Sequence, residues 1–234
     1  MKRVFVILLL IGHGFYLGIL PQYKTQIIGN NKAPVFINPY DCIKEAKSLL
    51  REGDIIMRLN TDPSSQLIRN FNRRDKKYSH SGIVLFENGH PYVFHISNGR
   101  QKAETKIRKD SLERFCNPMG NSSFGIFRYD FSSKELKNLK TVVHKWRSNG
   151  VSFDDRFDLA TNTKMYCSEM VAKAAEAATQ GRIHINPTKL TRLELTVLSA
   201  YTKHSFGQTE IIAIDDLYEQ PSCKTVKEYI YWKN

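Results

Sequence analysis

One cysteine of the chain stands where a helix is predicted to begin. Cys167 lies in the run 166–170 (YCSEM), at the start of the alanine-rich segment 168–179, which ends near a glycine. A helix N-terminus carries partial positive charge and free backbone N–H groups, which lower the pKa of a thiol and hold an oxyanion. These residues therefore indicate a thiolate nucleophile for acyl transfer at Cys167.

Two histidines lie on a predicted β-hairpin. Asn88-Gly89 is typical of a two-residue hairpin turn, and β-rich runs flank it on both sides. Such a turn places Gly82 opposite His95, so that His80 and His95 share one face as diagonal neighbours, roughly 7–8 Å apart at the backbone. A three-residue loop would instead put the two histidines on opposite faces.

The chemistry of such a site needs a base beside the thiol, and an imidazole supplies one near neutral pH. Cys167, His80 and His95 would act as nucleophile, base and orienting group. A structural interpretation stays open, because a lone cysteine or a strand histidine is often a core residue. Zinc also stays open, although no short ligand pair accompanies the three side chains. We expect no metal and no other cofactor.

The elements predicted around these residues mix helix and strand without regular βαβ alternation. Helices are expected at 41–50, from the cap at Asp62 onward, from the capping box Ser132/Glu135 to Gly150, and at 168–179. Strands are expected at 54–59, 78–86, 92–97, 126–129 and 211–214. This order predicts an α+β domain with an antiparallel sheet.

Length, composition and charge limit the classes of protein to which the chain can belong. The chain has 234 residues, of which 41% are hydrophobic, so it can bury the core of one domain and is not globally disordered. Its net charge of +12 is compatible with contact to an anionic membrane or the cell wall. We expect no nucleic-acid partner, because no basic stripe interleaved with aromatic residues stands out. The densest basic stretches, 69–77 and 100–109, are predicted to be exposed connections.

The N-terminal segment 1–20 is typical of a leader. A lysine and an arginine precede the apolar run 4–20, as in a cleaved secretory signal peptide or a short membrane anchor, with a plain hydrophobic helix as the third alternative. Either of the first two places the folded part outside the cytoplasm, in the periplasm or cell envelope. Residues 21–40 are predicted to be a linker, and 41–234 the catalytic domain.

The remaining cysteines are dispersed along the chain. If Cys167 is a free nucleophile, Cys42, Cys116 and Cys223 can form at most one disulfide bond between them, which an oxidising compartment would permit. The sequence does not select the pair.

At several segments the chain resembles the YiiX-like permuted papain-type amidases, relatives of the NlpC/P60 superfamily. The likeness lies in 53–56 (GDII), 78–84 (YSHSGIV), 153–157 (FDDRF) and 166–171 (YCSEMV), and it extends from about 44 to about 187. The histidine motif precedes the cysteine motif, which is the permuted order. The resemblance implies a papain-like core in which the sheet packs against the cysteine helix.

The resemblance also implies roles for individual residues. It makes Cys167 the nucleophile and His80 the base, and it places His95 at the third polar position, where the related lecithin:retinol acyltransferase-like branch uses a second histidine. Within the motifs, Tyr166 is expected to pack, while structural and catalytic roles both stay open for Glu169. Asp54 is expected to shape a turn.

Three functions are compatible with these observations. The first is a cysteine hydrolase that cleaves an amide bond, in cell-envelope peptides. The second is a lipid acyl hydrolase or acyltransferase at a membrane surface, suggested by His95, the basic charge and an anchor. The third is a non-catalytic envelope binding protein with an ordinary Cys167 thiol. The substrate is thus expected to be a peptide or an acyl lipid, selected by the loops 98–125 and 147–164.

Overall fold

The structure, a computed structural model, describes residues 38–99, 105–207 and 209–231. All of them belong to one compact unit that spans 37–234. The predicted leader 1–20 and almost all of the predicted linker 21–40 lie outside the described residues. Among the residues that are described, no helix combines the length and the apolar character needed to cross a membrane.

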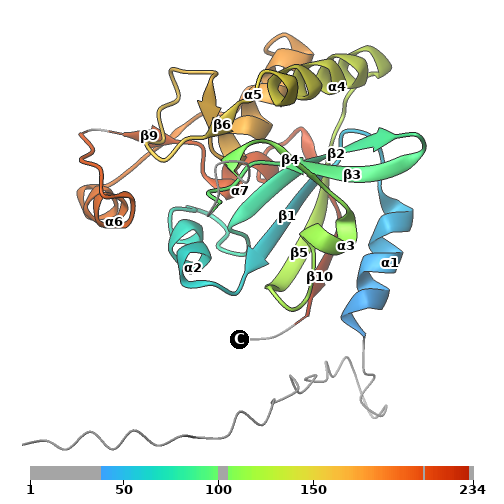
Figure 1. Cartoon of the computed structure of the whole chain (residues 1–234), viewed down its shortest axis with the longest axis horizontal. Coiled ribbons are helices and arrows are strands. Elements are labelled where there is room, and N and C mark those ends of the chain that lie inside the picture. Colours follow the sequence, from blue (N-terminus) through green and yellow to red (C-terminus); the bar gives the residue numbers. More distant parts are fainter. Residues whose placement is uncertain (1–37, 100–104, 208, 232–234) are drawn as a thin grey trace, which may run out of the picture. The chain divides into compact units, whose positions relative to one another are not determined.

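The centre of the molecule is a six-stranded sheet in which every pair of neighbours is antiparallel (Figure 1). In spatial order its strands are β10 (Cys223–Ile230), β5 (Asn121–Tyr129), β1 (Ile55–Asn60), β2 (His80–Glu87), β3 (His90–His95) and β4 (Arg108–Asp110). Two small pairs lie outside it: β6 (Ser152–Phe153) with β7 (Lys164–Met165), and β8 (Thr188–Lys189) with β9 (Glu210–Ile211). The predicted α+β class with an antiparallel sheet is confirmed.

The helices begin where the sequence supplies capping side chains. They are α1 (Pro39–Leu49), α2 (Pro63–Arg69), α3 (Leu112–Phe115), α4 (Ser133–Ser148), α5 (Cys167–Thr179), α6 (Arg192–Thr202) and α7 (Ile214–Tyr218). Asp62 accepts a hydrogen bond from the Ser65 amide at the start of α2. Ser132 and Glu135 form the predicted capping box of α4.

The sheet buries both of its faces, because alternate side chains along each strand point to opposite sides. On β1, Ile55 and Met57 belong to a cluster that includes the apolar residues of α4 and α5. Ile56, between them, belongs to a second cluster with residues of α1 and α3. Helix α5 packs against β2, which brings the start of α5 close to the start of β2.

The predicted hairpin forms with the predicted register. Glu87 pairs with His90 and Ile83 with Phe94. Asn88 and Gly89 have φ angles of 50° and 78°, as a two-residue type I′ turn requires. Gly82 therefore lies against β3, where an added Cβ would come within 3.1 Å of the His95 Cβ.

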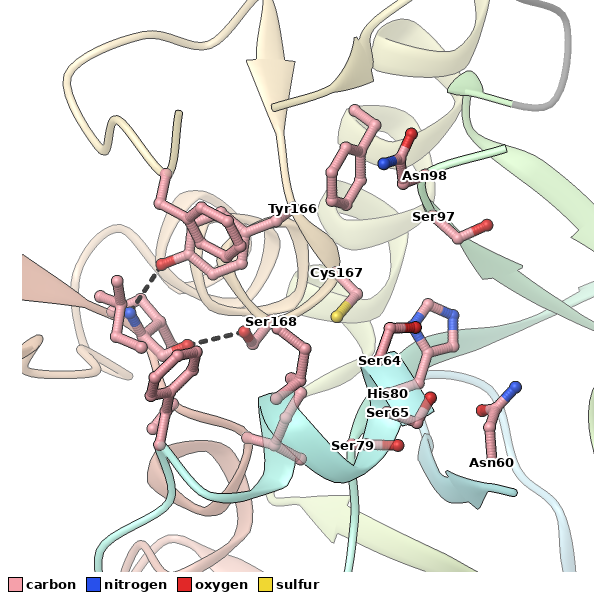
Figure 2. Close-up of a pocket in the computed structure, with 18 of the residues that line it drawn as sticks. Asn60, Ser64, Ser65, Ser79, His80, Ser97, Asn98, Tyr166, Cys167 and Ser168 are labelled. Carbon is pink, nitrogen blue, oxygen red and sulfur yellow. Dashed lines mark hydrogen bonds between the residues drawn. The ribbon is translucent and has the colours of Figure 1, made fainter. Parts of the chain in front are cut away.

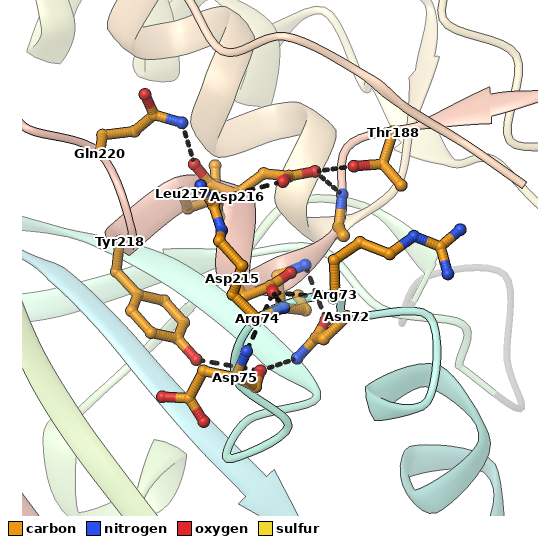
Figure 3. A network of polar contacts seen from close by, with 12 residues as sticks. Asn72, Arg73, Arg74, Asp75, Thr188, Asp215, Asp216, Leu217, Tyr218 and Gln220 are labelled. Atoms are coloured by element: carbon orange, nitrogen blue, oxygen red, sulfur yellow. Dashed lines mark hydrogen bonds and ion pairs between the residues drawn. The ribbon is translucent and has the colours of Figure 1, made fainter.

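The loop that precedes the histidine strand is anchored to α7 (Figure 3). The buried carboxylate of Asp215 accepts hydrogen bonds from the backbone amides of Arg73, Arg74 and Asp75, at 2.8, 2.6 and 3.2 Å. Asn72 accepts a bond of 3.1 Å from the Ile214 amide. These contacts fix the course of the chain just before His80.

Two predictions about elements are wrong. Of the expected strand at 211–214, only Ile211 lies in a strand, β9 (Glu210–Ile211). Ile214 instead begins α7, because Asp216 accepts a hydrogen bond from the Ala213 amide and caps a helical turn. In the basic stretch 100–109, Arg108 and Lys109 belong to β4 rather than to an exposed connection. The strand β10 and the helix α6 were not expected.

Candidate active site

Cys167 is the first residue of α5, and its neighbours lock the start of that helix in place. Glu169 accepts a hydrogen bond of 3.2 Å from the Tyr166 amide, which is a structural role at the helix start. The Tyr166 hydroxyl accepts a bond of 2.7 Å from the Ile212 amide, and the Ser168 hydroxyl donates one of 2.7 Å to the Ile212 carbonyl (Figure 2). Tyr166 thus packs, as expected, and also joins α5 to the segment before α7.

The Cys167 side chain is 8% exposed, and that surface faces a cavity of about 310 Å³. Burial raises the pKa of the Cys167 thiol above its ordinary value, while the Ser81 amide and hydroxyl and the first amides of α5 act in the opposite direction. The expectation of a depressed pKa is therefore wrong, because desolvation outweighs the helix N-terminus. The resting site holds a protonated thiol.

His80 and His95 are neighbours, as the hairpin register predicted. His80 Nε2 lies 3.0 Å from His95 Nδ1, and the two rings meet edge to face with centroids 5.1 Å apart. The Phe115 ring packs against both, at centroid distances of 5.6 and 4.9 Å. Side-chain packing from α3 therefore holds the histidine pair in one orientation.

The structure adds a residue that the sequence did not indicate. Asp110, at the end of β4, lies with Oδ2 3.0 Å from His95 Nε2. Arg108 donates a hydrogen bond of 2.8 Å to the same oxygen, and Arg114 lies 3.4 Å from the other. These cations and His95 keep the pKa of Asp110 below its ordinary value, against the effect of burial. The signal that could have found it was a single acidic residue directly after the basic stretch 100–109.

These contacts determine which ring nitrogens carry protons. Burial is the main cause that lowers the pKa of His95 to about 4 and that of His80 well below 6.5, so both rings are neutral at neutral pH. A carboxylate only accepts, so His95 must donate to Asp110 through Nε2–H, which leaves its Nδ1 as an acceptor. His80 must then donate through Nε2–H. Its Nδ1 is left with a free lone pair, the form of a general base.

Cys167 and His80, the predicted nucleophile and base, both line the same cavity (Figure 2). The sulfur is adjacent to Ser81, the residue that follows His80, and no hydrogen bond joins it to the His80 ring within the described residues. Catalytic hydrogen bonds are often long in a structure without substrate and shorten in the complex. The arrangement therefore supports proton transfer once a substrate closes the cavity.

The cavity is lined by both polar and apolar side chains. The polar ones come from β1, the α2 region, the start of β2 and the chain after β3: Arg58, Asn60, Asp62, Ser64, Ser65, Ser79, Ser97 and Asn98. The apolar ones are Ile68, Phe71, Phe153, Phe157, Tyr166, Tyr201, Ile211, Ile212, Ala213 and Ile214. Asn98, Phe153 and Phe157 belong to the segments 98–125 and 147–164, for which a role in specificity stays a prediction.

The donor atoms of the site do not fit a zinc ion. Hydrogen bonds join His80 to His95 and His95 to Asp110, and we call these three side chains the row Asp110–His95–His80. These bonds engage three ring nitrogens: His80 Nε2, His95 Nδ1 and His95 Nε2. Only the Cys167 sulfur and His80 Nδ1 remain as donors, whereas zinc takes at least three protein ligands. Within 38–99, 105–207 and 209–231, no group of three or more His, Cys, Asp or Glu side chains is arranged to hold a metal. All four cysteines are free thiols.

Comparison with known proteins finds relatives of the chain as a whole. The model of a family described as permuted papain-like amidase enzyme, YaeF/YiiX, C92 family, matches residues 49–227. The crystal structure of the metalloprotein YiiX from Escherichia coli O157:H7 is similar in fold, with a TM-score of 0.62 and 20% sequence identity over 77% of this chain and 98% of that one. A search of curated proteins found no match.

Proposed function

Because this chain belongs to the permuted papain-like amidase family C92, it is a cysteine-type amide hydrolase, and we propose that Cys167, His80, His95 and Asp110 carry its chemistry. The observation that supports this assignment best is the row Asp110–His95–His80, two contacts of 3.0 Å each, which ends at the cavity that Cys167 lines. The row sets the tautomer of the base, as the carboxylate does in a catalytic triad.

In the proposed reaction, the substrate amide lies in the cavity with its carbonyl carbon beside the Cys167 sulfur. His80 Nδ1 takes the thiol proton as the sulfur attacks, and the C–S bond forms while the carbonyl oxygen becomes an oxyanion. The backbone amides at the start of α5 have no partner within the helix, so they are available to stabilise that oxyanion.

The second half of the cycle returns the enzyme to its starting state. The His80 imidazolium donates its proton to the leaving nitrogen, the C–N bond breaks and an acyl-thioester remains on Cys167. Water then attacks with His80 as base, which releases the acid and restores the thiol. His95 and Asp110 stabilise the imidazolium in both halves, because His80 Nε2–H points at His95 throughout.

The proposed setting is the cell envelope, with peptides as substrates. The apolar leader in the sequence and the basic charge support export and contact with an anionic surface. The N-terminal sequence of the protein purified from its native host tests the export step: a mature chain that begins after about residue 20 is expected for a cleaved signal peptide. An intact first residue on a chain that stays in the cytoplasm would contradict it.

A second candidate function is that of a lipid acyl hydrolase or acyltransferase. The apolar side chains that line the cavity support it. Phe153, Phe157 and Ile211 would accommodate an acyl chain, and Leu193 and Tyr201 of α6 are exposed large apolar side chains. Release of fatty acid from anionic phospholipid vesicles, compared with cleavage of acyl peptides by the same preparation, separates the two candidates.

The test of the catalytic assignment is turnover by single variants. Cys167→Ala is expected to lower hydrolysis of acyl amides to the background rate, and His80→Asn to lower kcat by orders of magnitude. Cys42→Ala removes a thiol from α1 and is the matched control, expected to retain activity. A thioester adduct on Cys167, seen by mass spectrometry with an activated ester, would identify the nucleophile; full activity of Cys167→Ala would refute the assignment.

A further inference from the structure

Arg58 is a positively charged residue that lines the cavity shared by Cys167 and His80. It pairs with His80 across the β1–β2 ladder, so the two side chains lie on the same face of the sheet. Its Nη1 donates to the Phe115 carbonyl, and its guanidinium carbon lies 4.2 Å from the centre of the Phe115 ring. No carboxylate within the described residues forms an ion pair with it; Asp110 acts on it only at longer range and is already shared by Arg108, Arg114 and His95.

Three polar atoms of cavity-lining residues have no partner within the part of the chain that the structure describes. Arg58 Nε, Asn60 Oδ1 and the Ser79 hydroxyl are buried and make no hydrogen bond to any described residue, and all three side chains border the cavity. Figure 2 labels Asn60, Ser79 and His80 among the side chains that line this cavity. Buried polar groups in native proteins nearly always have partners, so a cluster of unpaired donors and acceptors at one pocket indicates a polar ligand.

Asp62, the one acidic side chain among the described residues that line the cavity, does not neutralise this charge. Asp62 accepts hydrogen bonds from the Ser65 amide at 3.0 Å, from the Ser65 hydroxyl at 2.7 Å and from the Ser64 hydroxyl. It is thus engaged as the cap of α2. Burial lowers the pKa of Arg58 to about 10, which leaves the guanidinium charged at neutral pH.

The position of Arg58 relative to the base tells which part of the substrate it meets. In amide hydrolysis His80 protonates the leaving nitrogen, so a group next to His80 on the same face lies on the amine side of the scissile bond. The apolar residues that line the cavity, Phe157 and Ile212 among them, would then contact the acyl side. A planar guanidinium matches a carboxylate through two parallel hydrogen bonds.

We propose that Arg58, with Ser79, binds a free carboxylate next to the scissile amide, so that the substrates are amides of an apolar acyl group with an amino acid. N-acyl amino acids and C-terminal dipeptides with an apolar penultimate residue share this chemistry. The inference rests on the proposed hydrolase function, and hydrolysis releases the apolar acid and the free amino acid with uptake of one water.

A pair of substrates that differ only in the carboxylate tests the proposal. Hexanoylglycine and hexanoylglycinamide have the same acyl group and the same amide bond. The wild-type enzyme is expected to prefer the acid by about 10- to 100-fold in kcat/KM, and Arg58→Gln is expected to bring the ratio close to one. The ratio is the readout because Arg58 also acts electrostatically on His80, which changes both rates together.

Control variants separate recognition from charge and from folding. Arg58→Lys keeps the charge without the planar fork and should retain part of the preference. Arg156→Gln removes the same charge from an exposed position and should keep the wild-type ratio. Thermal unfolding checks the fold of each variant; if Arg58→Gln does not fold, Ser79→Ala takes its place and is expected to lower the ratio by a smaller factor.

Binding measurements distinguish the proposed carboxylate subsite from the proposed hydrolase function. Calorimetry with the Cys167→Ala variant should show tighter binding of hexanoylglycine than of hexanoylglycinamide, and the difference should vanish when Arg58→Gln is added. A wild-type ratio near one, or a ratio unchanged in Arg58→Gln, overturns the carboxylate subsite while hydrolysis stands. Preferential binding of the acid without turnover of any amide by the wild type would support the subsite and refute the proposed hydrolase function.

Discussion

His95 Nε2 lies 3.0 Å from Asp110 Oδ2. This contact determines which ring nitrogen of His80 carries the proton, although Asp110 does not contact His80 itself. Because the carboxylate only accepts, it selects the Nε2–H form of His95, whose Nδ1 in turn accepts from His80 Nε2. Three adjacent strands, β2, β3 and β4, each supply one member of the row. His80, the proposed base, therefore has its free lone pair on Nδ1, and it lines the cavity.

Asp110→Asn should impair catalysis far more than it impairs folding. An amide can donate to His95 Nε2 and reverse the tautomer of both rings, which would place a proton on His80 Nδ1 where a lone pair is needed. We expect kcat to fall by about 10²- to 10⁴-fold, measured with a chromogenic acyl amide. Glu113→Gln, a few residues away, is the control and should retain kcat; wild-type kcat in Asp110→Asn would contradict the role of the row.

The pH dependence should be that of a neutral thiol and a neutral imidazole. Activity requires unprotonated His80, whose pKa lies well below 6.5, so the acidic limb of kcat/KM should fall below that pH. It also requires the proton of Cys167, whose pKa is raised above 9.0, so the alkaline limb should lie above 9.0.

Alkylation gives an independent check of this pH behaviour. With iodoacetamide, the reaction of Cys167 should be slow at mildly acidic pH and should accelerate only as the pH approaches the raised pKa. Rapid alkylation near pH 5 would instead reveal a thiolate–imidazolium pair and contradict the neutral resting state. A peptide containing an ordinary cysteine provides the reference rate.

Gly82→Ala should separate the two hairpin strands at the histidine pair. A Cβ at this position would lie 2.6 Å from Val93 Cγ1, 3.0 Å from the Phe94 carbonyl oxygen and 3.1 Å from the His95 Cβ. A backbone oxygen cannot move without β3, so we expect a loss of about 1–3 kcal/mol in the free energy of unfolding together with a marked loss of kcat. Denaturant unfolding and steady-state kinetics measure the two effects.

Gly120→Ala is the matched control for this overpacking. Nothing lies within 4 Å of a Cβ at that position, and Gly120 does not have a positive φ. It should leave both the free energy of unfolding and kcat close to those of the wild type. A Gly82→Ala protein with wild-type stability and activity would show that the strands can separate without cost.

Asp215→Ala should loosen the loop in front of the histidine strand. It leaves the part-buried amides of Arg73, Arg74 and Asp75 without their acceptor, and an amide that water cannot reach costs about 1–3 kcal/mol when it is unsatisfied. We expect a large drop in melting temperature and faster amide hydrogen exchange in 72–76. Glu219→Ala, at the exposed end of α7, is the control; unchanged exchange in Asp215→Ala would refute the anchoring role.

The sequence predicted best what depends on local chemistry. The Asn88-Gly89 turn has the φ angles that set the strand register. The turn residues alone therefore predicted that His80 and His95 lie on the same face as diagonal neighbours. Capping residues likewise fixed the starts of α2 and α4. Cys167 at the start of α5 was predicted from the composition of the helix that follows.

What the sequence did not predict depends on contacts between distant segments. Asp110 stands beside a basic stretch, and only the pairing of β4 with β3 turns it toward His95. The thiol pKa was predicted in the wrong direction, because the helix N-terminus is visible in the sequence whereas the burial of Cys167 is not. The strand β10 was missed because most of its side chains are exposed or half-buried, which weakens the apolar alternation.

The order of the motifs along the chain has a consequence for biosynthesis. A ribosome makes the histidine hairpin and β4 first, and α5 with its sulfur emerges much later. A nascent chain that ends before α5 thus contains His80, His95 and Asp110, the proposed proton-transfer residues, but lacks Cys167. Prematurely terminated copies without the proposed nucleophile are therefore expected to be inactive.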